Sequence, residues 1–212
     1  MTEIWFIRHG ETDWNRQRRL QGWQDIPLNS AGLEQAQRLT ERLRAGTAPF
    51  DALYSSDLKR ALSTAEPVSQ ALELRMRLEP GIRERSFGVL EGLDLERIDE
   101  LAPAAAAAWK SRDPTRALDG GETLGHFCAR VVTAVEDIAQ RHAGQRVLVF
   151  THGGVLDIIW RQAEGVALNA PRHASLLNVS INRVAIDGKQ WRILDWGDVA
   201  HVKQEVGNDI QP

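Results

Sequence analysis

The sequence predicts an α/β fold with three layers, in which a mixed, mainly parallel β-sheet is flanked by helices. Short, continuous apolar runs at residues 4–7 and 145–151 are typical of strands that are buried on both faces. Such runs alternate with amphipathic helical stretches along the chain, which favours parallel strands joined by helices. No repeat, low-complexity linker or abrupt change in composition divides the 212 residues. We therefore expect a single domain over residues 1–212.

The first unit of this fold is the strand at residues 4–7, followed by a polar loop and a helix. Asn29 and Ser30 are suited to cap that helix, because short polar side chains accept hydrogen bonds from free backbone N–H groups. The helix is predicted to be amphipathic, since apolar positions recur at steps of three and four residues. These positions are Leu33, Ala36, Leu39 and Leu43.

The second unit begins with a strand at residues 52–54. A helix is expected to start at residues 55–57 with Ser56 as its cap, and Pro67 should kink or shorten it. The buried stripe of this helix is predicted at Leu58, Ala61, Leu62 and Ala65.

The second half of the chain holds the longest helical period, from Leu124 to Ile138, followed by the strand at residues 145–151. Apolar and polar residues then alternate from Leu177 to Asn182, and Asp187-Gly188 leads into another apolar run. This pattern predicts a β-hairpin near the C-terminus.

Residues 85–121 are expected to form a small helical cap inserted over one edge of the sheet. An alanine-rich helix at residues 104–108 is flanked there by Pro103 and Pro114. Nothing in this stretch repeats the strand and helix alternation of the rest of the chain.

Charge and composition exclude several function classes. The 26 basic and 29 acidic residues give a net charge of −3, so no broad positive field attracts nucleic acid or an anionic membrane. Cys128 is the single cysteine, which excludes a disulfide framework and a cysteine-rich zinc site and fits a cytoplasmic location. No leader pattern and no apolar run of membrane-spanning length is present, so we expect a soluble, unprocessed protein.

Two histidines are the strongest candidates for chemistry, because each follows a predicted buried strand and precedes a glycine. They are His9, in Arg8-His9-Gly10, and His152, in Thr151-His152-Gly153. Open α/β sheets bind ligands beyond the carboxyl ends of their strands, so both imidazoles should meet at one crevice if the two strands are neighbours. The structural alternative is a pair of histidines whose hydrogen bonds are satisfied at strand ends.

Arg60 and Glu84 are weaker candidates on pattern alone. Arg60 is expected in the first turn of its helix, where free N–H groups favour an anion, although most helix arginines are simply solvated. Glu84 lies between two arginines, and a surface ion pair is its structural alternative. Six carboxylates crowd this region, so the pattern does not choose among them. They are Glu84, Glu91, Asp94, Glu96, Asp99 and Glu100.

Several reaction classes lose their main support because their motifs are absent. The sequence contains no phosphate-binding P-loop, no dinucleotide-binding glycine pattern, no zinc-protease helix motif and no serine-hydrolase elbow. No metal-ligand spacing was found, so we expect no metal and no cofactor. Cys128 lies within a helical apolar stripe and is expected to pack in the core.

The octapeptide from Arg8 to Asn15, Arg-His-Gly-Glu-Thr-Asp-Trp-Asn, resembles the opening motif of the histidine phosphatase superfamily. This group includes cofactor-dependent phosphoglycerate mutases and many small phosphatases. The resemblance covers almost the whole chain and is weakest after about residue 185. It continues through Gln21-Gly22, residues 25–32 and 54–65, Arg83-Glu84, residues 88–92 and 120–123, and Thr151 to Gly154.

The resemblance implies a phosphoglycerate mutase-like fold and a specific set of site residues. It makes His9 the phosphorylated nucleophile, and it makes Glu84 the general acid and base. It implies that Arg8, Arg60 and His152 hold the transferring phosphoryl group. Further substrate contacts are expected from Asn15, Gln21, Gly22 and Gly153. The chemistry agrees, since an imidazole can attack phosphorus while guanidiniums stabilise the equatorial oxygens without a metal.

Departures from the mutase pattern favour hydrolysis. Mutases carry His-Tyr-Gly after the acid and a lysine slightly further on, whereas this chain has Ser86-Phe87-Gly88 and Leu95. The Gly153-Gly154 pair resembles the phosphatases. We therefore expect a metal-independent phosphomonoester hydrolase that acts on a small phosphorylated metabolite through a phosphohistidine. A phosphoglycerate mutase-type phosphotransferase and a non-catalytic phosphate-binding module are the alternatives, and a homodimer is left open.

Overall fold

The computed structural model describes residues 1–46 and 49–202. In this part of the chain a mixed sheet contains six strands in the order β3-β2-β4-β1-β5-β6. The strands are β1 (Thr2–Arg8), β2 (Ala52–Ser55), β3 (Met76–Leu78), β4 (Arg146–Thr151), β5 (Ile181–Asp187) and β6 (Gln190–Asp198). The pairs β3–β2, β2–β4 and β4–β1 are parallel, while β5 and β6 are antiparallel to their neighbours. The predicted mixed, mainly parallel sheet is thus confirmed.

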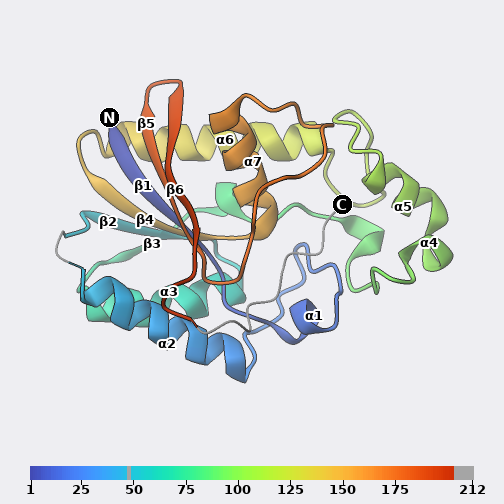
Figure 1. Ribbon diagram of the computed structural model, residues 1–212. Helices are drawn as coiled ribbons and strands as arrows, with labels where there is room; N and C mark the ends of the chain where they lie inside the picture. The colour runs from blue at the N-terminus through green and yellow to red at the C-terminus, as the bar shows by residue number, and fades with distance from the viewer. Residues whose placement is uncertain (47–48, 203–212) are drawn as a thin grey trace.

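Helices cover both faces of this sheet (Figure 1). Helices α2 (Ser30–Arg44) and α3 (Lys59–Ala71) lie on one face, and α6 (Leu124–Arg141) and α7 (Gly153–Glu164) lie on the other. The short helices α1 (Asp13–Arg16), α4 (Ile98–Leu101) and α5 (Pro103–Lys110) lie outside the sandwich. Two 3₁₀ turns, at Pro80–Ile82 and Gly88–Leu90, complete the described elements.

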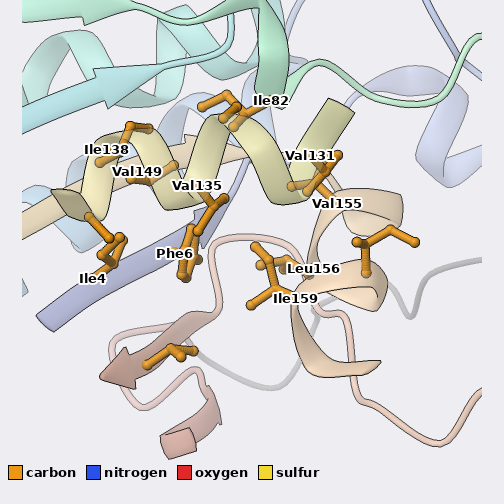
Figure 2. Close-up of a cluster of buried hydrophobic side chains, with 14 of the residues drawn as sticks. Ile4, Phe6, Ile82, Val131, Val135, Ile138, Val149, Val155, Leu156 and Ile159 are labelled. Atoms are coloured by element: carbon orange, nitrogen blue, oxygen red, sulfur yellow. The ribbon is translucent and has the colours of Figure 1, made fainter. Parts of the chain in front are cut away.

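The central strands are buried on both faces because their side chains alternate between two cores. Ile4 and Phe6 of β1 belong to the cluster under α6 and α7, whereas Ile7 belongs to the cluster under α2 and α3. Figure 2 shows Val131 and Val135 of α6 lying over this part of the sheet. Both positions were predicted to belong to the longest helical stripe, so the periodicity indicated the correct face.

Local structure departs from the predictions at several positions in the first two units. Asn29 caps α2 as expected, and its side chain accepts from the N–H of Gly32. Leu33, however, is 53% exposed. Gly32 packs against the backbone of Glu11, so close that an added Cβ would lie 2.1 Å from the Glu11 carbonyl oxygen. The buried face of α2 therefore runs through Gly32, Ala36, Leu39 and Leu43, and Leu33 lies outside it.

Helix α3 begins later than predicted, and Ser56 is not its cap. The backbone stays extended through Ser56, whose N–H donates to the carbonyl of Phe150 in β4. Leu58 is therefore the N-cap, without a side-chain hydrogen bond. Pro67 does not shorten the helix, which continues to Ala71.

The C-terminal hairpin is confirmed, although its first strand starts at Ile181 rather than Leu177. The preceding residues form a turn in which Ser180 N–H donates to the carbonyl of Leu177 and Val179 has φ +50°. The polar side chains of this stretch can be buried because they form hydrogen bonds with backbone groups. Asn178, for example, donates to the carbonyl of His9.

Residues 85–121, the stretch predicted to form a cap, contain α4 and α5, which lie to one side of the sheet (Figure 1). Helix α5 spans the alanine-rich run, and residues 85–121 share a small hydrophobic core with Leu20. That core consists of Leu20, Phe87, Leu90, Ile98, Ala106, Ala108, Trp109 and Leu118. None of the helices within residues 1–46 and 49–202 combines the length and apolar character that crossing a membrane requires.

Candidate active site

The two candidate histidines meet because their strands are parallel neighbours in register. Arg8 of β1 is paired with Thr151 of β4, and each histidine is the next residue along its strand. The N–H of His9 donates to the carbonyl of Thr151 over 2.9 Å. The two imidazole rings lie with their centroids 5.3 Å apart. The pairing of β1 with β4 therefore brings the two imidazoles together at the carboxyl ends of these strands.

The backbone fixes the tautomer of His9. Its Nδ1 lies 2.7 Å from the carbonyl oxygen of Gly10, and a carbonyl can only accept, so Nδ1 carries the proton. The neutral ring then holds its lone pair on Nε2. The carbonyl of His9 accepts from Asn178, and the N–H of Gly10 donates to Thr64 Oγ1, so the strand end is held on both sides.

His152 is held by a residue from the third adjacent strand. Ser56 follows β2 directly, and its Oγ lies 2.8 Å from Nε2 of His152. The same Oγ accepts a long hydrogen bond of 3.4 Å from the N–H of Leu58, and its own proton is available to Nε2. In the tautomer that accepts this proton, the neutral His152 ring carries its own proton on Nδ1. This nitrogen is buried, without a hydrogen-bond partner in the described part of the chain.

Both histidines are neutral at physiological pH. Burial, reinforced by the guanidinium of Arg60, lowers the pKa of His9 well below its usual value of 6.5. Burial and Arg60 lower the pKa of His152 in the same direction. A neutral His9 has the lone pair that a nucleophile needs.

Two buried arginines supply positive charge next to the imidazoles. Arg8 is the last residue of β1, and its guanidinium donates to the carbonyl of Leu176. Arg60 lies in the first turn of α3, as predicted, and donates to the carbonyls of Gly22 and Gln24 over 2.8 and 2.9 Å. Burial lowers the pKa of Arg60 to about 10, so it remains charged at neutral pH.

Glu84 is the one member of the six crowded carboxylates that lines the pocket containing His9. It is 6% exposed. Its Oε1 accepts from the N–H of Arg85 over 2.8 Å, and its Oε2 accepts from the N–H of Gly154 over 3.0 Å. The Glu84 carbonyl accepts from the indole N–H of Trp23 over 2.8 Å. This residue is therefore fixed by three segments of the chain.

The arginines on either side of Glu84 in the sequence form hydrogen bonds with other groups. Arg83 forms a two-bond ion pair with Asp57, and Arg85 donates to the carbonyl of Glu122. Glu91 is held by the N–H groups of Trp23 and Phe87, each at 3.0 Å. Glu91 therefore connects two loops. Since it does not line the pocket, Glu84 is left as the candidate acid.

The pocket between these groups is small, with a volume of about 30 Å³. Asn15, Gln21 and Gly22 line it, as expected of substrate contacts, whereas His152 and Gly153 do not form part of its lining. The Oδ1 of Asn15 accepts from the N–H of Thr12, so its amide NH₂ is the group that can donate to a ligand. The remaining lining residues are Arg8, His9, Arg19, Leu20, Arg60, Glu84, Phe87 and Leu95.

Sequence reasoning missed Ser56 and Gly154 as parts of this site. Ser56 was interpreted as a helix cap, and Gly154 as part of a motif without a function of its own. Both contact residues that are far away along the chain. Ser56 could have been identified only if the pairing of β2 with β4 had been known, and Gly154 only if Glu84 had already been assigned as the acid. No group of three or more potential metal ligands occurs among residues 1–46 and 49–202.

Comparisons with known proteins point to one family. Residues 4–199 match the histidine phosphatase superfamily (branch 1). The chain is 39% identical to metal-independent phosphoserine phosphatase of Arabidopsis thaliana over 204 residues, which cover 95% of this chain and 84% of that protein. It is 38% identical to phosphoglycerate mutase-like protein 4 of the same plant, over 95% of this chain and 87% of that protein.

A solved structure is similar over nearly the whole chain. The YhfR protein of Bacillus stearothermophilus superimposes with a TM-score of 0.85 at 33% sequence identity. The match covers 96% of this chain and 100% of that protein.

Proposed function

Because the chain belongs to the histidine phosphatase superfamily (branch 1), we propose that it hydrolyses small phosphomonoesters through a phosphohistidine on His9. One observation carries this proposal. A neutral imidazole with a free lone pair, two charged guanidiniums and a fixed carboxyl group all line one pocket. These are the parts that two successive in-line displacements at phosphorus require.

In the first displacement, Nε2 of His9 attacks the phosphorus atom of the substrate. The bond between phosphorus and the ester oxygen breaks as the N–P bond forms, and Glu84 gives its proton to the leaving oxygen. The positive charge that develops on the ring is stabilised by the Nδ1–H donated to Gly10. Arg8 and Arg60 balance the charge on the equatorial oxygens.

In the second displacement, water attacks the phosphorus atom of phosphohistidine. Glu84, now a carboxylate, accepts a proton from this water, and the N–P bond breaks with its electron pair returning to Nε2. Inorganic phosphate leaves and the neutral imidazole is restored. The Nδ1–H of His152 and the amide of Asn15 are suited to donate to the phosphoryl oxygens in both steps.

The wall of the pocket supports a compact substrate. Leu20, Phe87 and Leu95 contribute apolar surface, and Arg19 adds a cation from the loop. At the positions where mutases carry His-Tyr-Gly and a lysine, the side chains of Phe87 and Leu95 offer no hydrogen-bond donor. Phosphoserine is the first substrate to test, because a relative with 39% identity is a phosphoserine phosphatase.

The role of Glu84 is tested by comparing two leaving groups. An alkoxide leaves poorly unless it is protonated, whereas p-nitrophenolate leaves without help. Glu84→Gln should therefore lower phosphate release from phosphoserine by about 10² to 10⁴ and from p-nitrophenyl phosphate much less.

Equal losses with both substrates would mean that Glu84 only positions the site. A panel of phosphorylated metabolites assayed for released phosphate then identifies the substrate. Interconversion of 2- and 3-phosphoglycerate, primed with the bisphosphate and without net release of phosphate, would support the mutase alternative instead. Binding of phosphate with no turnover of any substrate would support a non-catalytic module.

A further inference from the structure

The carboxyl group of Glu84 lies directly on the first turn of α7. Gly154 is the second residue of this helix, and its N–H donates to Glu84 Oε2 over 3.0 Å. The N-cap residue, His152, makes no capping hydrogen bond with its own side chain. Glu84 therefore takes the place of an N-cap for α7, although it lies 70 residues away in the sequence.

This contact requires a residue without a side chain. A Cβ added to Gly154 would lie 2.1 Å from Oε1 and 3.1 Å from Cδ of Glu84. No φ in the left-handed region explains the glycine, since Gly154 is helical and its φ is not positive. The backbone conformation alone would admit alanine, so the constraint comes from the space that the carboxyl group occupies.

Hydrogen bonds hold both the carboxyl group and the main chain of Glu84. Its other oxygen accepts from the N–H of Arg85, and the Glu84 carbonyl is held by Trp23 and by Arg130, which donates over 3.2 Å. A methyl group at residue 154 would break the Gly154 hydrogen bond and push the carboxyl group out of its position. The main chain of Glu84 would stay where it is.

We propose that Gly154 is a positioning residue for the reaction, which sets where the Glu84 carboxyl group meets the leaving oxygen. This inference rests on the proposed role of Glu84 as acid and base. Gly154 itself touches no reacting atom. It acts through its N–H and through the absence of a Cβ.

The first test is kinetic and uses the full chain. Gly154→Ala should lower phosphate release from phosphoserine by an amount on the order of 10², and release from p-nitrophenyl phosphate much less, since only the alkyl ester needs the proton. The double variant Gly154→Ala with Glu84→Gln should be no slower than Glu84→Gln alone. Val155→Ala serves as the matched control, because it perturbs the next residue of α7 without placing an atom near Glu84 and should leave the ratio of the two substrates unchanged.

The second test is thermal unfolding, which remains informative if Gly154→Ala folds poorly. Alanine normally stabilises a helix relative to glycine, yet here Gly154→Ala should lower the Tm of the wild type. In a Glu84→Ala background the space is vacant, and the same substitution should leave the Tm unchanged or raise it.

Two results would overturn the inference. One is an equal loss of activity with both substrates, and the other is the same change in Tm in both backgrounds. If Glu84→Gln lowers the release of phosphate from both substrates equally, the proposed role of Glu84 as acid fails. The inference about Gly154 can still be judged in that case, because the comparison of Tm values does not depend on catalysis.

Discussion

At the scale of single residues, hydrogen bonds determine which ring nitrogens of the two imidazoles can contact a ligand. The carbonyl of Gly10 fixes the proton of His9 on Nδ1, and Ser56 holds Nε2 of His152. Burial and Arg60 lower the pKa of both rings. His9, the proposed nucleophile, is therefore neutral at neutral pH without the help of a general base.

Replacing His9 with alanine should abolish turnover and leave the fold intact, because no binding interaction can replace a missing nucleophile. Labelled substrate, quenched during turnover, should give an adduct on the wild type that is labile in acid and stable in base. His9→Ala should give none. A phosphoserine or an acyl phosphate found in its place would overturn the assignment.

Replacing Ser56 with alanine should lower kcat/KM roughly tenfold, since loss of one buried hydrogen bond costs about 1–2 kcal/mol. The tautomer of His152 would no longer be fixed, so nitrogen NMR of this ring should show mixed protonation of Nδ1 and Nε2. Ser55→Ala is the control, because Ser55 Oγ donates to a backbone carbonyl. Unchanged kcat/KM in Ser56→Ala, or an equal loss in Ser55→Ala, would rule out the proposed role.

At the scale of elements, ion pairs of the Asp157 carboxylate connect α7 to the predicted cap and to the loop after α7. Asp157 of α7 pairs with Arg161 of the same helix, with Arg112 at the end of the cap and with Arg172 of the loop after α7. The side chain of Asp157 is 4% exposed. This buried ion cluster fixes α7, whose first turn holds Glu84.

Asp157→Asn keeps the shape of the side chain but leaves three arginines without their shared counter-charge. Breaking a buried ion cluster in this way typically costs about 3–5 kcal/mol, which urea unfolding would measure as a lower midpoint. The control Asp137→Asn removes an exposed pair with Arg141 on α6 and should cost at most about 1 kcal/mol. Similar losses in the two variants would contradict the importance of burial at Asp157.

At the scale of the whole molecule, the fold brings its positive charge to one end of the sheet although the net charge is −3. Arg8 ends a central strand and Arg60 begins a helix beside it. Phe87 and Leu95, from the predicted cap, line the pocket at the same end. A phosphoryl group would thus be attracted by the positive charge of this local site and not by a positive electrostatic field of the whole molecule.

Activity should survive a strong chelator, because Arg8 and Arg60 supply the charge that a metal ion supplies in other phosphatases.

Vanadate should inhibit, since it adopts the five-coordinate geometry of phosphoryl transfer and a site shaped for that geometry binds it tightly. Phosphate release would be measured with and without each reagent. Activity that is lost on chelation and restored by a divalent cation would exclude the mechanism.

The sequence by itself determined the elements of this protein and the positions of most candidate residues. Hydrophobic periodicity indicated β1, β4, α6 and the terminal hairpin, because these patterns follow from local backbone geometry. His9 and His152 stood out since each follows a buried strand. The resemblance to a family singled out Glu84, which the pattern of residues had left as one carboxylate among six.

Only the tertiary structure decided how these residues are held. Ser56 contacts His152 across 96 residues of sequence, and Gly154 contacts Glu84 across 70. Likewise, it is Gly32, packed against Glu11, that lies on the buried face of α2, and Leu33 is exposed. Such contacts depend on which strands are neighbours and on how closely two backbones approach, and the periodicity of a single segment carries no information about either.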